Sequence, residues 1–276
     1  PQEEILSTDD ETITFVGKHQ KPLKASIVQH WKELGGDLLD PPPFNPLPVD
    51  WNPDAVAVSP GRHGWIALSI NGKILYVAGL THPELKRACA LISKAAAASS
   101  LRIWSVEDDM ALTHLVSFVW RIQDEICWAI LSSRELRHGL LKVASKVDSS
   151  QAGNDDKTGD SFYTVRLVGA LGVTDALLDA NHVRHKAVSL SSAGAEVFGG
   201  VDVTKASARV SECVEDTAGM TEPVPEVLAM DATSAIRNVI GGITENMSYL
   251  NRAADIRVRF TGAYWRCPHR EGRWEE

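Results

Sequence analysis

The chain has 276 residues, 44% of them hydrophobic and 23% charged, which is ordinary for a globular protein. No apolar run reaches the roughly 18 residues that a membrane-spanning helix needs, and the polar, acidic first ten residues do not resemble a signal peptide. The net charge of −8 argues against a free-standing nucleic-acid binder, which is usually basic. It does not exclude a protein that polymerises along RNA, since each subunit then needs only a few cations.

The four cysteines are far apart in the sequence and form no CxxC pair. Cys89 and Cys127 lie within apolar patterns typical of helices, where a free cysteine acts as a small hydrophobic residue. This usage predicts a reducing compartment without a disulfide framework.

The first 104 residues predict a small α+β unit. Residues 12–16 have the composition of a strand. The proline-rich stretch at 41–48 predicts an extended connector, because proline interrupts helices and central strands. A rigid surface loop is a better interpretation of this stretch than a ligand for a proline-binding module.

A hairpin and a helix are expected next. Apolar runs at 65–70 and 73–77 flank Asn71-Gly72, and Asn-Gly between two apolar runs is typical of a two-residue hairpin turn. A helix is then predicted from Pro83 to about residue 99, because proline is favoured in the first turn of a helix.

The pattern changes after Trp104. Residues 108–130 predict a long helix whose apolar stripe consists of Leu112, Leu115, Val116, Val119, Ile122, Ile126 and Ile130. Ser132 and Glu135 have the spacing of a capping box and predict the start of a second helix. Its expected stripe consists of Leu136, Leu140, Val143 and Val147.

Shorter elements follow. Alternation of apolar and polar residues at 162–167 predicts a strand, and residues 173–181 predict a short helix. Residues 187–229 are rich in Gly, Ala, Ser, Val and acids and show no clear period.

The last long helix is predicted to begin at Asp231, a favourable N-cap residue, and to run to about Asn251. Residues 255–260 alternate and predict a closing strand. Four helices between residues 108 and 251 predict a mainly α fold, an up-and-down four-helix bundle with a small closing sheet and an N-terminal α+β extension.

No common catalytic motif occurs in the sequence, including the nucleotide-binding glycine loops and the metalloprotease motif. His182-x-x-His185 would place two imidazoles on one helix face, but no third ligand is near in sequence, so no metal site is predicted. Asp216 begins a short GTPase-like motif, DTAG, that lacks the phosphate-binding loop it would need.

Cations are spread over three elements of the predicted bundle. Arg134 and Arg137 are one helical turn apart, Arg184 and Lys186 flank the end of the short helix, and Arg237 lies opposite the apolar stripe of the last helix. Each alone is typical of a solvated surface, whereas together they could line a groove for a phosphate backbone.

Three segments resemble the coat proteins of tobamoviruses. Residues 230–237 (MDATSAIR) and 248–252 (SYLNR) are similar to that family's last long helix. Residues 174–180 (TDALLDA), continuing to Arg184 and Lys186, are similar to a shorter helix and the basic turn after it. Residues 260–265 (FTGAYW) are similar to its aromatic C-terminal strand. The resemblance covers roughly residues 108–266.

This resemblance implies a structural capsid protein that polymerises into a helical rod around single-stranded genomic RNA, in virions and in the host cytoplasm, with no enzymatic activity, no membrane and no cofactor. Residues 1–104 would form an extension at the outer surface, and residues 105–276 the coat domain. RNA would be bound through phosphate and ribose contacts. The implied RNA-binding residues are Arg137, Arg184, Lys186, Asp231, Ser234, Arg237 and Asn238.

Two departures and one carry-over accompany the resemblance. Residues 227–230 are apolar where the family has an arginine pair, for which Arg209 is a possible substitute, and residues 187–229 are longer than the family's segment. Family rods also contain carboxylate pairs that repel across subunit contacts and raise each other's pKa. The candidates here are Glu196, Asp202, Glu212, Glu215, Asp216, Glu222 and Glu226.

Three alternatives stay open. The first is a non-viral helical-bundle interaction protein. The second is the nucleoprotein of a negative-strand RNA virus. The third is an enzyme with an unfamiliar site among His182, His185 and Asp216, although no nucleophile and base are paired in the sequence.

Overall fold

The computed structural model describes residues 2–7, 11–55, 59–97, 103–151, 158–188, 192–231, 233–241 and 252–274. Contacts divide the chain into two compact units, Pro1–Gln2 with Gly17–Trp128, and Glu3–Val16 with Ala129–Glu276. No helix within the described ranges is both long and apolar enough to cross a membrane.

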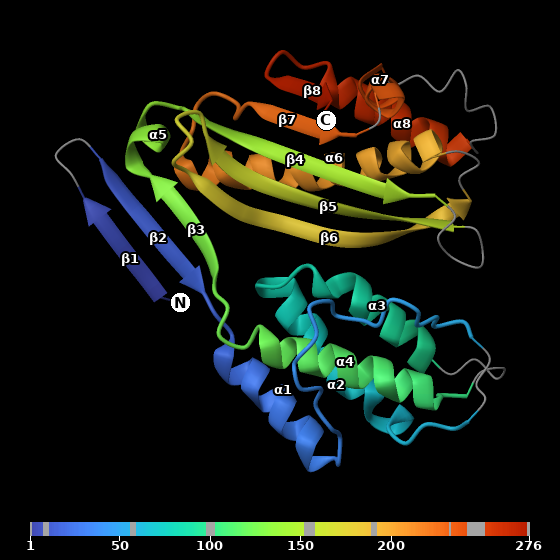
Figure 1. Cartoon of the computed structure of the whole chain (residues 1–276). Helices are drawn as coiled ribbons and strands as arrows, with labels where there is room; N and C mark the ends of the chain where they lie inside the picture. The colour runs from blue at the N-terminus through green and yellow to red at the C-terminus, as the bar shows by residue number, and fades with distance from the viewer. Residues whose placement is uncertain are drawn as a thin grey trace. The chain divides into compact units, whose positions relative to one another are not determined.

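In its described residues the first unit contains four helices around one apolar core (Figure 1). They are α1 (Lys21–Glu33), α2 (Gly64–Leu80), α3 (Leu85–Ala96) and α4 (Val106–Arg121). Helix α3 confirms the helix predicted from Pro83, and the proline-rich stretch at 41–48 contains neither helix nor strand, as predicted.

The predicted hairpin at 65–77 is wrong, because these residues form helix α2. Asn71 is buried inside the helix, and its side-chain amide donates hydrogen bonds to Cys89 O and Ser93 Oγ, each at 2.8 Å. Helix α2 is apolar on all sides, so packing against α3 outweighs the local turn preference of Asn-Gly.

The long helix predicted at 108–130 is shorter than expected. Helix α4 begins with a capping box formed by Ser105 and Asp108 and ends at Arg121, so the buried part of the stripe runs from Leu112 to Ile122. The remaining residues of the prediction lead into strand β3 (Cys127–Ser132).

The second unit contains an eight-stranded mixed sheet in the order β1-β2-β3-β6-β5-β4-β7-β8 (Figure 1). Besides β3, the strands are β1 (Gln2–Ser7), β2 (Thr12–Lys18), β4 (Leu141–Ser150), β5 (Thr158–Gly169), β6 (Asp175–Val188), β7 (Glu226–Met230) and β8 (Arg270–Trp274). Strands β4, β5 and β6 form an antiparallel meander, whereas β7 pairs parallel with β4, and β8 pairs parallel with β7. Strands β2 and β5 confirm the strands predicted at 12–16 and 162–167.

Helix α6 (Ser192–Ala218) packs on one face of this sheet (Figure 1). Helices α7 (Thr233–Gly241) and α8 (Arg252–Trp265) pack beside α6, and the short α5 (Ser133–Arg137) joins β3 to β4. Inward-facing residues of β4 and β5, among them Val143, Val147 and Val165, meet Val197 and Val201 of α6 in the core.

The predicted mainly α four-helix bundle is therefore wrong, since the second unit is an α/β fold with a mixed sheet. Of the predicted second helix only the N-cap is confirmed: Ser132 Oγ accepts a hydrogen bond from the Glu135 backbone N–H, but the helix is only α5. The apolar residues that follow alternate along strand β4, where Leu141, Val143 and Val147 face the core. The spacings of four, three and four residues from Leu136 to Val147 fit a helical period, but only Val143 and Val147 of this stripe also fit the period of two that β4 follows.

Two further predictions are corrected in the same region. Residues 173–181 lead into and form strand β6 rather than a helix. Residues 187–229, for which the sequence shows no clear period, contain α6. The closing strand predicted at 255–260 lies in helix α8. The helix predicted to start at Asp231 is confirmed for α7, and its continuation to residue 251 lies outside the described residues.

Candidate metal centre

Two aspartates lie side by side because of the parallel pairing of β4 and β7. In this register Val147 is the partner of Met230. The next residue on each strand is therefore an aspartate, Asp148 on β4 and Asp231 directly after β7. Both side chains are exposed. Ligand-binding residues commonly gather at the carboxyl ends of neighbouring parallel strands.

A third carboxylate comes from the first turns of helix α6. Glu196 is followed at one helical turn by Gly199, where a Cβ atom would overlap Ser149 Oγ on β4 and Ser161 Oγ on β5. The absence of a side chain at Gly199 therefore lets α6 lie close against the sheet. This close approach brings Glu196 to the end of β4.

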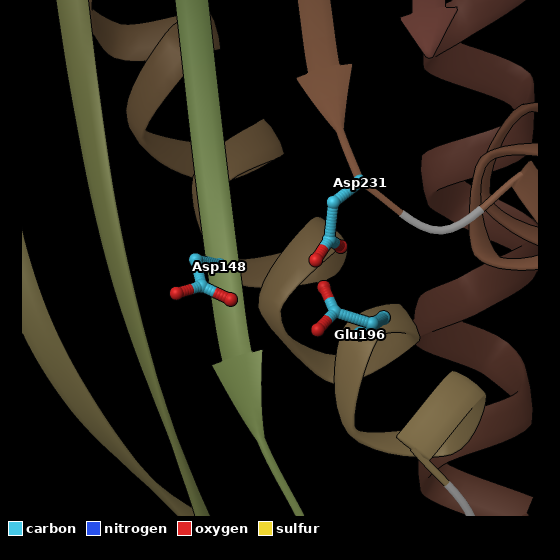
Figure 2. A group of neighbouring side chains, drawn as sticks. All are labelled: Asp148, Glu196 and Asp231. Atoms are coloured by element: carbon cyan, nitrogen blue, oxygen red, sulfur yellow. The ribbon is translucent and has the colours of Figure 1, made fainter. Parts of the chain in front are cut away.

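The ligand oxygens of Asp148, Glu196 and Asp231 all lie within 4.8 Å of one another. Figure 2 shows the carboxylates of Glu196 and Asp231 pointing at each other, with Asp148 on the neighbouring strand. Glu196 is only 4% exposed, and its Oε1 accepts a hydrogen bond of 3.1 Å from the Ser149 backbone N–H. Its Oε2 is buried without a hydrogen-bond partner among the described residues.

The electrostatics of this cluster are unfavourable for three negative charges. Burial, together with the charges of Asp231 and Asp148, raises the pKa of Glu196 to about 7, and the hydrogen bond from Ser149 opposes that rise only in part. Near neutral pH, binding of either a proton or a cation therefore stabilises the cluster.

The donor set fits a hard divalent cation. Carboxylate oxygens are the ligands preferred by Mg²⁺, Mn²⁺ and Ca²⁺, whereas the cluster contains neither the thiolate nor the imidazole typical of zinc sites. The buried, unpartnered Oε2 of Glu196 supplies an independent reason for a ligand, because an unpaired buried carboxylate oxygen is costly. Asp148, Glu196 and Asp231 are the residues that would hold the ion.

The residues that the sequence predicted to bind RNA lie on four separate parts of the second unit. Arg137 is exposed on α5 and donates to the Ser133 backbone carbonyl at 3.2 Å, and Arg184 lies on β6 and donates to Thr158 Oγ1 at 3.2 Å. Lys186 is also on β6, Asp231 follows β7, and Ser234, Arg237 and Asn238 lie on α7. Only Asp231 belongs to the carboxylate cluster, and RNA binding by the others stays a prediction.

Sequence reasoning named two of the three carboxylates but gave them other roles. Asp231 was expected to contact ribose, and Glu196 was among the acids expected to repel a neighbouring subunit. The raised pKa of Glu196 instead arises within one chain. Asp148 was missed. Its only signal in the sequence is an acid at the end of an alternating apolar stretch, which can be interpreted only once the stretch is assigned as a strand.

His182 and His185 share strand β6 rather than a helix face. His182 Nε2 lies 3.4 Å from Asp160 Oδ1, and His185 Nε2 lies 2.5 Å from Ser161 Oγ. Asp216 lies near the C-terminal end of α6, whereas the carboxylate cluster contains Glu196 at its N-terminal end. These three residues therefore do not form the site that the enzyme alternative required.

No known protein family and no curated protein matches the sequence. Among solved structures, RNase H1 from the archaeon Halobacterium salinarum NRC-1 is 16% identical with a TM-score of 0.32, over 49% of this chain and 85% of that one. The N-terminal RNase H domain of a Mycobacterium tuberculosis protein is 15% identical with a TM-score of 0.30, over 49% and 82%. Prototype foamy virus protease–reverse transcriptase is 8% identical with a TM-score of 0.32, over 49% and 17%. Likenesses this weak establish neither a family nor a function.

The predicted relation to tobamovirus coat proteins is contradicted. The segment TDALLDA, expected to be a helix, lies almost wholly in strand β6, and FTGAYW, expected to be a strand, lies in helix α8. Residues 227–230 are apolar because they form the buried strand β7. Without a four-helix bundle, the expected capsid function and the helical polymer around RNA lose their basis, and so does the helical-bundle interaction protein. The expectation that the chain is not an enzyme is contradicted as well, because three carboxylates that could hold a metal ion lie together in the second unit.

Proposed function

We propose that this protein is a divalent-metal-dependent phosphodiesterase that cleaves nucleic acid, with Asp148, Glu196 and Asp231 as its metal-binding residues. The observation that carries the proposal is the convergence of these three carboxylates within 4.8 Å, one of them buried with an unpartnered oxygen. The solved structures named above include ribonucleases H, but the proposal depends on the carboxylates alone.

The arrangement has a buried side and an open side. On the buried side lies Glu196, which accepts a hydrogen bond from the Ser149 backbone N–H. On the open side lie Asp148 and Asp231, which are exposed at the strand ends. A substrate therefore approaches past the two aspartates. A bound Mg²⁺ or Mn²⁺ ion would supply Lewis-acid activation of a phosphoryl oxygen and of water.

The substrate class follows from the charge of the site. Three carboxylates repel a phosphodiester unless a cation lies between them, so phosphate binding is expected only in the loaded site. Carboxylate sites for Mg²⁺ typically leave coordination positions for water and for substrate phosphates. The exposure of Asp148 and Asp231 suits a polymer, which does not need to be enclosed.

The test is cleavage of labelled RNA, DNA and RNA–DNA hybrid by the purified chain with Mg²⁺, Mn²⁺, Ca²⁺ or chelator. We expect cleavage with Mg²⁺ or Mn²⁺ and none with chelator. Asp148→Asn and Asp231→Asn should each lower the rate by at least about 100-fold, because each removes a charged ligand of the ion.

The matched control is Glu212→Gln, which neutralises an exposed acid farther along α6 and should cleave like the wild type. Cleavage that survives Asp148→Asn or Asp231→Asn would come from a contaminant or another site and would refute the proposal. Cation binding without cleavage of any of the three substrates would make the cluster a structural ion site instead.

A further inference from the structure

Beneath the carboxylate cluster, polar side chains on three neighbouring strands form a continuous chain of hydrogen bonds. Ser149 Oγ on β4 lies 2.7 Å from Ser161 Oγ on β5, and Ser161 Oγ lies 2.5 Å from His185 Nε2 on β6. Ser149 and Ser161 are direct partners in the antiparallel register. Ser161 and His185 are 1% and 5% exposed, so neither group is positioned to meet a substrate.

This chain ends on the residue that holds Glu196. The backbone N–H of Ser149 donates to Glu196 Oε1, and this is the one hydrogen bond that Glu196 is seen to make among the described residues. Both serine hydroxyls also lie where a side chain at Gly199 would be, directly under the first turns of α6. The chain of hydrogen bonds therefore reaches Ser149, whose backbone N–H donates to Glu196, and both hydroxyls lie against the helix that carries Glu196.

We propose that Ser161 and His185 are positioning residues of the metal centre, which act through Ser149 to hold Glu196 in place for a cation. The proposal rests on the proposed function, because it concerns the same three carboxylates. Outer residues that orient metal ligands commonly change metal affinity by about 10–100-fold when they are removed.

The protonation state of His185 suits this role. The pKa of His185 is lowered, chiefly by burial and to a smaller extent by the neighbouring His182. The negative charges of Asp202 and Asp160 raise this pKa, but not enough to cancel the lowering. The imidazole is therefore neutral at pH 7, so it adds no positive charge beside a site that must attract a cation. The ring also packs edge-on against Phe198 of α6, with the ring centroids 5.6 Å apart.

The experiment measures Mn²⁺ affinity of the full chain by isothermal titration calorimetry at pH 7.5, together with the urea midpoint of each variant. Ser161→Ala removes the central hydroxyl and should weaken Mn²⁺ binding by about 10-fold or more. His185→Phe keeps a ring but removes both nitrogens and should have a similar effect. His185→Gln should restore most of the affinity, because its amide nitrogen can replace Nε2.

Ser145→Ala is the matched control. Ser145 lies four residues before Ser149 on the same buried face of β4, and its hydroxyl has no hydrogen-bond partner among the described residues. This variant should bind Mn²⁺ like the wild type. If Ser161→Ala does not fold, the comparison of His185→Phe with His185→Gln decides the matter.

The outcomes separate the two proposals. Equal Mn²⁺ affinity for the wild type, Ser161→Ala and His185→Phe would overturn the positioning role and leave the metal centre intact. A wild-type chain that binds no Mn²⁺ would overturn the metal centre itself, and the positioning role with it. Loss of affinity in both His185→Phe and His185→Gln would show that ring packing, rather than the hydrogen bond at Nε2, is what matters, and would refute the proposal.

Discussion

Two buried glutamates of the second unit show how the same side chain is stabilised in opposite ways. Glu226, at the start of β7, is 1% exposed and accepts hydrogen bonds from Ser207 Oγ at 2.6 Å, Tyr264 Oη at 2.5 Å and Arg270 Nε at 2.8 Å. Glu196, in the cluster beyond the end of the same strand, is 4% exposed and has two other carboxylates beside it instead of a cation.

The two glutamates differ in whether the chain itself compensates the buried charge: it does so for Glu226 and not for Glu196. The charge of Glu226 is balanced by Arg270, whose guanidinium also lies 3.6 Å from the centroid of the Tyr264 ring. Burial and Glu226 raise the pKa of Tyr264, so its hydroxyl stays protonated and donates. Among the residues that the structure describes, Glu196 accepts one hydrogen bond, and burial with two neighbouring carboxylates raises its pKa, so its ionised form is much less favoured than that of Glu226.

The largest loss of stability is expected on replacement of Glu226. Glu226→Ala should lower the free energy of unfolding by about 3–5 kcal/mol, because it leaves the buried Ser207 hydroxyl and the half-buried polar groups of Tyr264 and Arg270 without their acceptor. Urea denaturation at pH 7 measures this loss, and Glu226→Gln, which keeps an acceptor oxygen, should lose less. A loss below about 1 kcal/mol for Glu226→Ala would remove the distinction between the two glutamates.

Replacement of Glu196, in contrast to Glu226, is expected to raise the free energy of unfolding of the metal-free protein above pH 7. Its folded-state pKa of about 7 lies above the unfolded value near 4.5, so the folded chain binds more protons between these values. Stability without metal should therefore fall as pH rises from about 4.5 to 7, by an amount on the order of 3 kcal/mol, and then level off.

Glu196→Gln should remove this pH dependence and make the metal-free protein more stable than the wild type at pH 8. Adding Mn²⁺ at pH 8 should stabilise the wild type and leave Glu196→Gln nearly unchanged, because a ligand stabilises only the state that binds it. Thermal unfolding at pH 5 and pH 8, with and without Mn²⁺, measures both effects. A variant less stable than the metal-free wild type at pH 8 would contradict the electrostatic account.

The smallest change in stability is expected at Gly199, where α6 lies close against the sheet. Gly199→Ala should cost about 1–3 kcal/mol, because the new methyl group overlaps the Ser149 and Ser161 hydroxyls. Gly72→Ala in α2 is the matched control: nothing lies within 4 Å of its added Cβ, so it should gain up to about 1 kcal/mol from helix propensity. Equal changes in the urea midpoints of the two variants would mean that α6 does not need its close approach.

Much of the local structure could be predicted from the sequence, and the errors have specific physical causes. Helix α3 and the start of α7 have clear signals, Pro83 in the first and Asp231 in the second. Helix α6 was missed because the residues that it buries include Ser207, Thr204 and Gly199, whose low hydrophobicity hides the helical period. Helix α2 was mistaken for a hairpin because its Asn-Gly pair is typical of a turn.

The three acids, and the place of Asp148 and Asp231 directly after apolar residues, are determined by the sequence alone. Their convergence was decided by the tertiary structure, because it depends on the parallel register of Val147 with Met230 and on the close packing of α6 at Gly199. Residues 148, 196 and 231 are separated by more than thirty positions each, and no local period relates them. Only the pairing of distant strands and one helix makes three ordinary carboxylates a single site.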